Sequence, residues 1–195
     1  MLFKETAAPQ TLDLIKRFFK DSRLDEFVLV GGTALSLQIG HRVSLDIDLF
    51  NVKPFDAGAI AAYLRSNYGA EHIVILENCV FCFVEDIKVD IISHQYPWVE
   101  IPMDVEGVRM VSLADIGAMK LNAIVQNGSR LKDFVDVYFL LECIPLQKLL
   151  RCCEMKYRDL SDKVIKRALL YHDDIKPAPI AMTGEYLSYQ KLKYD

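Results

Sequence analysis

The chain has 195 residues, of which 52% are hydrophobic, and a formal net charge of −4. Its length suits one well-buried domain or two subdomains that share a core, and its composition excludes a disordered chain. The acidic balance argues against a protein that coats nucleic acid through bulk positive charge, so any nucleic-acid partner must be bound locally.

The first expected elements are an amphipathic helix over residues 11–20 and an apolar strand over residues 27–30. Gly31 and Gly32 follow the strand, and a short helix begins at Thr33. Glycines let backbone N–H groups come close to an anion, and the start of a helix adds donors and partial positive charge. This stretch therefore predicts a phosphate-binding turn.

Residues 43–49 alternate between apolar and polar types, which predicts a strand with Ser44, Asp46 and Asp48 on one face. Residues two apart on a strand have Cα atoms roughly 6.6 Å apart, a separation from which two carboxylates can converge on one cation. Hard divalent cations take oxygen ligands and leave positions open for substrate phosphates. A solvated sheet face is the alternative interpretation of the same pattern.

A third carboxylate lies on one of the next strands. On its strand, Asp90 shares a face with Lys88 and Ile92, opposite Val89 and Ile91. An unpaired charge there would be costly, so either a salt bridge with a nearby lysine or a metal shared with the two earlier aspartates must compensate it. The expected elements of this region are a helix and three strands, at residues 59–68, 72–76, 80–84 and 87–92.

A proline-bounded linker covers residues 96–102, and a short strand is expected at residues 108–111. The linker contains Tyr96 and Trp98, which either stack on a base or fill the core. Ser112 is a suitable start for the helix that follows. Lys120 falls within the apolar stripe of this helix, so its amine either reaches outward to solvent or meets an anion.

The next helix, over residues 130–141, places Asp133 and Asp136 on one polar stripe with Arg130. Pairing of these aspartates with Arg130 or Lys120 is one interpretation. Further helical sequence begins at residue 145, and the tail beyond residue 173 is expected to lie over the surface or contact a partner. Basic residues of this last region could contact RNA phosphates or form a solvated helix face: Lys148, Arg151, Lys156, Arg158, Lys163, Lys166 and Arg167.

The five cysteines occupy irregular positions, and no secretory leader follows Met1. Both observations predict reduced thiols and a cytoplasmic protein. The apolar runs are far shorter than the ~20 residues needed to cross a bilayer, so no membrane span is expected.

Taken in order, the string Gly31-Gly32-Thr33-Ala34-Leu35 and the string Arg42-x-Ser44-x-Asp46-x-Asp48-Leu49-Phe50 resemble a known signature. It is that of the AbiEii/AbiGii toxin branch of the DNA polymerase β-like nucleotidyltransferase superfamily, to which the MenT toxins are related. The resemblance covers approximately residues 27–141. It implies an α+β fold with a nucleotidyltransferase core over residues 1–110, a mixed sheet flanked by helices. A helical C-terminal subdomain over residues 111–195 would pack over the active site.

The resemblance also implies a chemistry, the transfer of a nucleoside monophosphate from a nucleoside triphosphate to an acceptor hydroxyl, with Mg²⁺ or Mn²⁺ as cofactor. Asp46 and Asp48, with Asp90, would hold the metal. Asp133 or Asp136 would act on the incoming nucleotide, the acceptor or Lys120, with Asp133 ranked first because it follows a lysine as in the family motif. The remaining implied roles concern the triphosphate, which Gly31, Gly32 and Thr33 would cradle, while Arg42, Ser44 and Lys120 would bind phosphate or orient the loop.

The implied acceptor is RNA, with the 3′ end of a tRNA as the expected position. The implied setting is the toxin of a toxin–antitoxin or phage-defence pair, with a cognate antitoxin as a partner. Two rivals stand beside this hypothesis. One is transfer to a small molecule of the antibiotic type or to a protein side chain, and the other is a non-catalytic nucleotide-binding module.

Overall fold

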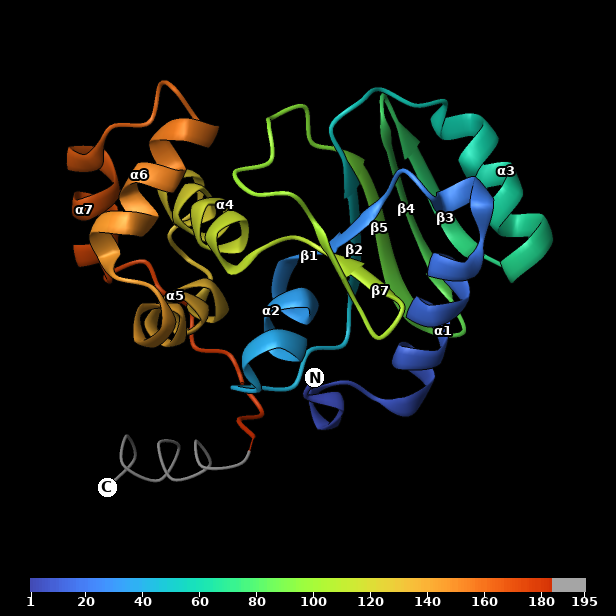
Figure 1. The fold of residues 1–195 in the computed structure, drawn as a ribbon, viewed down its shortest axis with the longest axis horizontal. Helices are drawn as coiled ribbons and strands as arrows, with labels where there is room; N and C mark the ends of the chain where they lie inside the picture. The colour runs from blue at the N-terminus through green and yellow to red at the C-terminus, as the bar shows by residue number, and fades with distance from the viewer. Residues whose placement is uncertain (184–195) are drawn as a thin grey trace.

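Short apolar runs form the centre of the structure, a computed structural model that describes residues 1–183. They build a mixed seven-stranded sheet of order β3-β4-β5-β2-β1-β7-β6 (Figure 1). The central strand β2 pairs parallel with β5 and antiparallel with β1. The strand bounds are β1 Val28–Val30, β2 Ile47–Asn51, β3 Glu71–Leu76, β4 Cys79–Val84, β5 Ile87–Ser93, β6 Met103–Val105 and β7 Val108–Met110.

The helices gather on two sides of this sheet (Figure 1). Helices α1 and α3 pack beside the strands, and the rings of Phe18 and Tyr68, one from each helix, are 4.9 Å apart. We call this half of the molecule the sheet side, and the opposite half, formed by α4 to α7, the helical side. Helix α2 lies between them and contacts β1, β2 and α4. The helix bounds are α1 Pro9–Lys20, α2 Gly31–Ile39, α3 Ala57–Tyr68, α4 Leu113–Gln126, α5 Leu131–Cys143, α6 Leu146–Lys156 and α7 Asp162–Leu170, with short 3-10 turns at Lys4–Thr6 and Ser22–Leu24.

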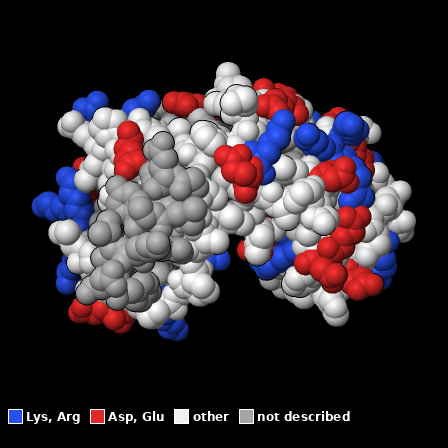
Figure 2. All heavy atoms as spheres, turned by 90° about the horizontal axis from the view of Figure 1, so that it is seen from below, with Lys and Arg blue, Asp and Glu red and all other residues white. Residues whose placement is uncertain are grey.

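The α+β class with a mixed sheet is therefore confirmed, and the division of the chain at residues 110 and 111 stays a prediction. Seen from below, the surface shows a notch between the helical side and the sheet side (Figure 2). On the sheet side both signs of charge are present (Figure 2). No helix within residues 1–183 is both long and apolar enough to cross a bilayer.

Most expected elements are present, with small shifts at their ends. The side chain of Ser112 accepts a hydrogen bond from the Asp115 N–H and caps α4, as predicted. The Asp56 side chain caps α3 in the same way. Strand β6 was not expected, because its three residues are too few to show a period of two.

The predicted extent of the second strand is wrong. Strand β2 begins at Ile47, and Leu45, expected on the core face, is 61% exposed. The preceding residues form a loop whose backbone bonds outside the sheet, since the Ser44 N–H donates to the Thr6 carbonyl and the Val43 N–H to Ala181. The apolar–polar alternation in the sequence therefore begins before the strand itself does.

The interpretation of Lys156 as a surface cation is also wrong, because this residue is only 2% exposed. Its ammonium lies 3.0 Å from Asp115 Oδ1, donates to the Pro97 carbonyl at 2.8 Å and lies 4.6 Å from the centre of the Trp98 ring. Asp115 also accepts from two backbone N–H groups of the linker, one of them that of Val99. Trp98 thus packs against the core, and one buried ion pair holds the linker against α4 and α6.

The described part of the tail lies over the surface, as expected. The Lys176 N–H donates to the Ser129 carbonyl, and Met182 forms an isolated bridge with Arg42. The remainder of the predicted tail, residues 184–195, lies outside the described residues.

We expect Asp115→Ala to destabilise the protein by about 3–5 kcal/mol, because removal of one partner leaves a buried, uncompensated Lys156 charge. Urea unfolding followed by circular dichroism measures the loss. Asp159→Ala, at an exposed aspartate, is the control and should stay within about 0.5 kcal/mol of the parent. Equal stability of the two variants would show that the buried pair contributes nothing.

Candidate active site

Two carboxylates face each other at the centre of the sheet. Asp48 on β2 and Asp90 on β5 are register partners on adjacent parallel strands, so their side chains point to the same face. Lys88 on β5 forms a 2.5 Å ion pair with Asp90 Oδ2, while Asp90 Oδ1 is buried and has no hydrogen-bond partner within residues 1–183. Burial, and then the negative charge of Asp90, raise the pKa of Asp48 to about 6. The Asp48–Asp90 pair therefore carries more negative charge than the single ammonium of Lys88 can balance.

Asp46 lies just before this strand and is exposed. Its carbonyl accepts a hydrogen bond from the Thr33 hydroxyl, which ties the loop to the first turn of α2. The charge of Asp46 also raises the pKa of Asp48, which places the two carboxylates within electrostatic reach. Asp46 thus joins the group from the loop and not from the strand that the sequence predicted.

The two glycines stand against these carboxylates at the start of α2. Gly31 has a φ of +70°, and a Cβ added to it would lie 2.2 Å from Asp48 Oδ2. A Cβ on Gly32 would lie 2.4 Å from Arg42 Nη2 and 3.1 Å from Ser44 Oγ. Only glycine permits this close approach of the helix start to the carboxylate and to the loop.

A second buried carboxylate, Asp136 on α5, lies at the centre of a group of donors. It accepts from Arg42 Nε at 2.6 Å, Arg42 Nη2 at 2.9 Å and His41 Nε2 at 2.9 Å, and its Oδ2 lies 2.7 Å from Lys120 Nζ. Burial alone would raise the pKa of Asp136, but the Lys120 charge and the bonds from His41 and Arg42 hold it far below its usual range. The bidentate contact joins the loop that contains Arg42 to α5.

Lys120 connects this group to the catalytic candidates. Its ammonium lies 2.7 Å from Asp133 Oδ1 and 2.7 Å from Asp136 Oδ2. Burial would lower its pKa, but the two carboxylates raise it, so the amine stays charged. That positive charge lowers the pKa of Asp48 and opposes the effect of Asp90. The anion predicted for Lys120 is thus, in this structure, a pair of aspartates.

The two helix aspartates, Asp133 and Asp136, differ in how many of their oxygens are already bonded. Both oxygens of Asp136 are bonded. In the described chain Asp133 Oδ2 is buried without a hydrogen-bond partner, and Arg130 Nε lies 3.6 Å from it. The unbonded oxygen makes Asp133 the better candidate for a group that acts on a substrate, and that role stays a prediction.

The residues present fit a divalent cation whose remaining ligands come from the substrate. Asp48 and the unbonded oxygen of Asp90 are hard donors, and a cation between them would offset both the burial and the repulsion that raise the pKa of Asp48. Within the part of the chain that the structure describes, no three His, Cys, Asp or Glu side chains group closely enough to hold a metal ion by themselves. Mg²⁺ commonly binds through one or two carboxylates together with substrate phosphates, so two protein ligands suffice.

The sequence placed Lys88 on the face of Asp90 but did not find the partner of His41. Lys88 compensates Asp90, which confirms the salt bridge considered as an alternative but leaves one oxygen free. His41 is fully buried against Asp136, and burial lowers its pKa, so its ring is neutral. The period of two in β5 placed Lys88 on the face of Asp90, but nothing local pairs His41 with a residue 95 positions later.

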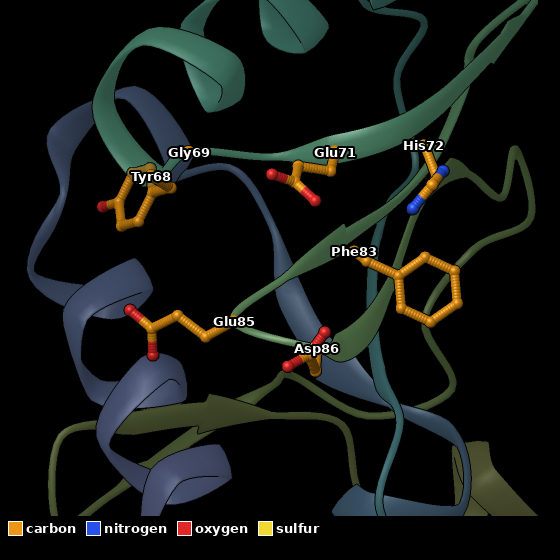
Figure 3. Close-up of a pocket in the computed structure, with 7 residues that line it drawn as sticks. All are labelled: Tyr68, Gly69, Glu71, His72, Phe83, Glu85 and Asp86. Carbon is orange, nitrogen blue, oxygen red and sulfur yellow. The ribbon is translucent and has the colours of Figure 1, made fainter.

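A pocket of about 670 Å³ lies elsewhere, between the end of α3 and strands β3 and β4. Figure 3 shows Tyr68, Glu71 and Glu85 turned toward the same space. Its lining contains none of the aspartates described above, and Glu85 is already paired with Arg17. This acidic pocket does not suit a phosphate.

Comparison with known proteins identifies relatives of this arrangement. The sequence model of a family described as "Nucleotidyl transferase AbiEii toxin, Type IV TA system" matches residues 13–188. The uncharacterized protein aq_aa25 of Aquifex aeolicus (strain VF5) is 32% identical over 158 residues, which cover 78% of this chain and 76% of that protein.

Solved structures share the fold at low identity. The antibiotic-resistance factor ANT(2'')-Ia is 15% identical with a TM-score of 0.58, over 78% of this chain and 94% of that one. A putative nucleotidyltransferase from H. pylori is 18% identical with a TM-score of 0.50, over 96% of this chain and 100% of that one.

We expect Gly31→Ala to destroy the phosphate-binding turn, because the new Cβ would overlap the Asp48 carboxylate. Gly107→Ala is a matched control, since Gly107 has a φ of +79° and a Cβ there would meet nothing within 4 Å. The left-handed backbone alone costs each variant roughly 1–2 kcal/mol, and the overlap with Asp48 adds to this cost in Gly31→Ala; urea unfolding measures both losses. Only Gly31→Ala should lose binding of inorganic tripolyphosphate in calorimetry, and retained binding would contradict the assignment.

Asp136→Asn should destabilise the fold more than Asp133→Asn does. The first substitution removes the charge that balances buried Arg42 and Lys120, at about 3–5 kcal/mol, whereas the second leaves Lys120 its bond to Asp136. Urea unfolding of both variants checks the difference. Equal losses would mean that the two aspartates share the structural role.

Proposed function

The chain belongs to the AbiEii nucleotidyltransferase toxin family and is a nucleotidyltransferase, and we propose that it transfers a nucleoside monophosphate to an RNA hydroxyl in a metal-dependent reaction. The observation that carries the proposal is the Asp48–Asp90 pair beside Gly31 at the start of α2. A triphosphate on the helix start would bring its α-phosphate next to these carboxylates.

The chain's own residues then supply most of the site. The N–H groups that follow Gly31 and Gly32 bind the triphosphate, and Thr33 keeps the Asp46 loop in place. Lys120 adds a fixed positive charge toward the phosphates. Asp48 and Asp90 are the proposed protein ligands of Mg²⁺ or Mn²⁺, and the nearby charge of Asp46 adds to the attraction for the cation. When bound, the metal would neutralise charge on the attacking and leaving oxygens.

The transfer itself forms one bond and breaks one. The acceptor oxygen bonds to the α-phosphorus in line, the bond to the bridging oxygen breaks, and pyrophosphate leaves. The acceptor proton passes to a carboxylate that the metal leaves free, for which the exposed Asp46 is the candidate. Asp133, with its own unbonded oxygen, orients Lys120 or the acceptor.

An RNA acceptor is supported by the open surface around the carboxylates. On the sheet face of Asp90, register pairing leads outward to Phe81 and then to Val74, which is exposed. Small acceptors are usually enclosed by their sites, whereas an exposed face admits an end of a large molecule such as the 3′ end of a tRNA. Exposed basic residues of α6 and α7 and of the turn between them would contact phosphates: Lys148, Arg151, Arg158, Lys163, Lys166 and Arg167.

The family description extends the proposal to biology. A protein of this family would act as a toxin in the cytoplasm, where nucleoside triphosphates and tRNA are found, with an antitoxin as its partner.

Transfer to a small molecule is the second candidate, and the fold shared with the antibiotic-resistance factor ANT(2'')-Ia favours it. Transfer to a protein side chain uses the same chemistry. The identity of the labelled acceptor separates these alternatives.

The deciding experiment incubates the full chain with each α-labelled nucleoside triphosphate, Mg²⁺ and total RNA. We expect label in the RNA fraction, at the 3′ end of tRNA, and a loss of at least roughly 100-fold in Asp48→Ala, since single preorganised groups contribute about that much. EDTA should abolish the label, and excess Mg²⁺ or Mn²⁺ should restore it. Asp159→Ala, at an exposed aspartate, is the active control.

Other outcomes of this experiment would contradict the RNA acceptor, the catalytic activity or the metal dependence. Label on a small molecule or a protein from a cell extract would replace RNA as the acceptor. Binding of nucleotide without any transfer would identify a non-catalytic module. Transfer that persists in EDTA would contradict the proposed metal dependence.

A further inference from the structure

Four aromatic side chains form a continuous series beside the candidate active site. The ring centres of Phe50 and His94 are 5.4 Å apart, those of His94 and Tyr96 are 4.8 Å apart, and those of Tyr96 and Tyr157 are 4.8 Å apart. We call these four residues the aromatic ladder. None of them has a role in the phosphate chemistry described above.

The ladder begins next to the carboxylates. Phe50 is two residues beyond Asp48 on β2, so both side chains point to the same face, with Cα atoms roughly 6.6 Å apart. On β1, Val30 pairs with Asp48 and Val28 pairs with Phe50. Because α2 starts directly after Val30, Phe50 lies on the opposite side of Asp48 from the phosphate-binding turn.

Both sides of the molecule contribute to the ladder. Phe50 comes from the sheet, His94 and Tyr96 follow β5, and Tyr157 follows α6. The His94 N–H donates to the Asn51 carbonyl at 2.8 Å, and His94 Nε2 lies 2.9 Å from the Tyr157 hydroxyl. These bonds hold the rings in place before any ligand arrives.

The chemistry of the ladder suits a flat, uncharged partner. Burial lowers the pKa of His94 to about 4, so its ring is neutral near pH 7. Tyr157 is buried, whereas Tyr96 is 45% exposed and forms the open part of the series. Trp98, the other aromatic candidate of the linker, is covered by Lys156 and is excluded.

We infer that Tyr96, supported by the other three rings, is the stacking surface for the base of the bound nucleoside triphosphate, a role that rests on the proposed function. The base is joined through one ribose to the α-phosphate, so it must lie close to Asp48. The glycine turn occupies one side of Asp48, and the ladder occupies the side opposite. A base stacked there places the triphosphate across the carboxylates toward α2.

The test compares two ligands that differ in having a base. Binding of a non-hydrolysable nucleoside triphosphate and of inorganic tripolyphosphate, both with Mg²⁺, is measured by calorimetry on the full chain. Tyr96→Ala should weaken nucleotide binding by roughly 5- to 150-fold, the range found for base–aromatic stacking, and leave tripolyphosphate binding unchanged. Tyr96→Phe should retain nucleotide affinity, and Tyr171→Ala, at another half-exposed tyrosine, should have no effect.

The outcomes separate this inference from the proposed function. If neither ligand binds to the unaltered chain, the proposed function fails and the inference fails with it. If both bind and Tyr96→Ala weakens neither, the inference alone is overturned. If Tyr96→Ala leaves nucleotide affinity unchanged but raises the KM for the RNA acceptor, the ladder stacks an acceptor base and the assignment to the donor is wrong.

Discussion

The buried carboxylate of Asp136 is the constraint on which the site depends. It binds Arg42 and His41 from the loop before β2 and Lys120 from α4, so it joins the helical side of the molecule to the sheet side. Removing one member of such a group leaves an uncompensated buried charge. The loop that contains Asp46 is thus positioned from a helix more than eighty residues further along the chain.

Charge is balanced around Asp136 but not around Asp48, and this contrast explains the division of roles. Two cations, Arg42 and Lys120, face Asp133 and Asp136. At the sheet, Lys88 alone pairs directly with one of three carboxylates, and burial together with the charge of Asp90 raises the pKa of Asp48. The first group holds the fold together, while the second favours an added cation. A single acidic motif would not have distinguished the two.

Local patterns predicted the elements and the faces, because periods of two and of 3.6 residues act within one strand or helix. They placed Asp48 and Asp90 on the same kind of surface and Lys120 inside a buried stripe. They failed where distant segments determine the environment. Asp46 leaves the strand because its loop bonds to Thr33, and Lys156 is buried because Asp115 lies against it, 41 residues earlier in the chain.

The geometry also divides substrate recognition into two parts. Backbone N–H groups and a cation bind phosphates, which every nucleoside triphosphate has, while a ring such as Tyr96 binds the face of any base. Two polar atoms of the ladder, His94 Nε2 and the Tyr157 hydroxyl, are bonded to each other. Stacking of the rings therefore contributes affinity for any base, and a choice among nucleotides must come from polar groups that meet the base edge.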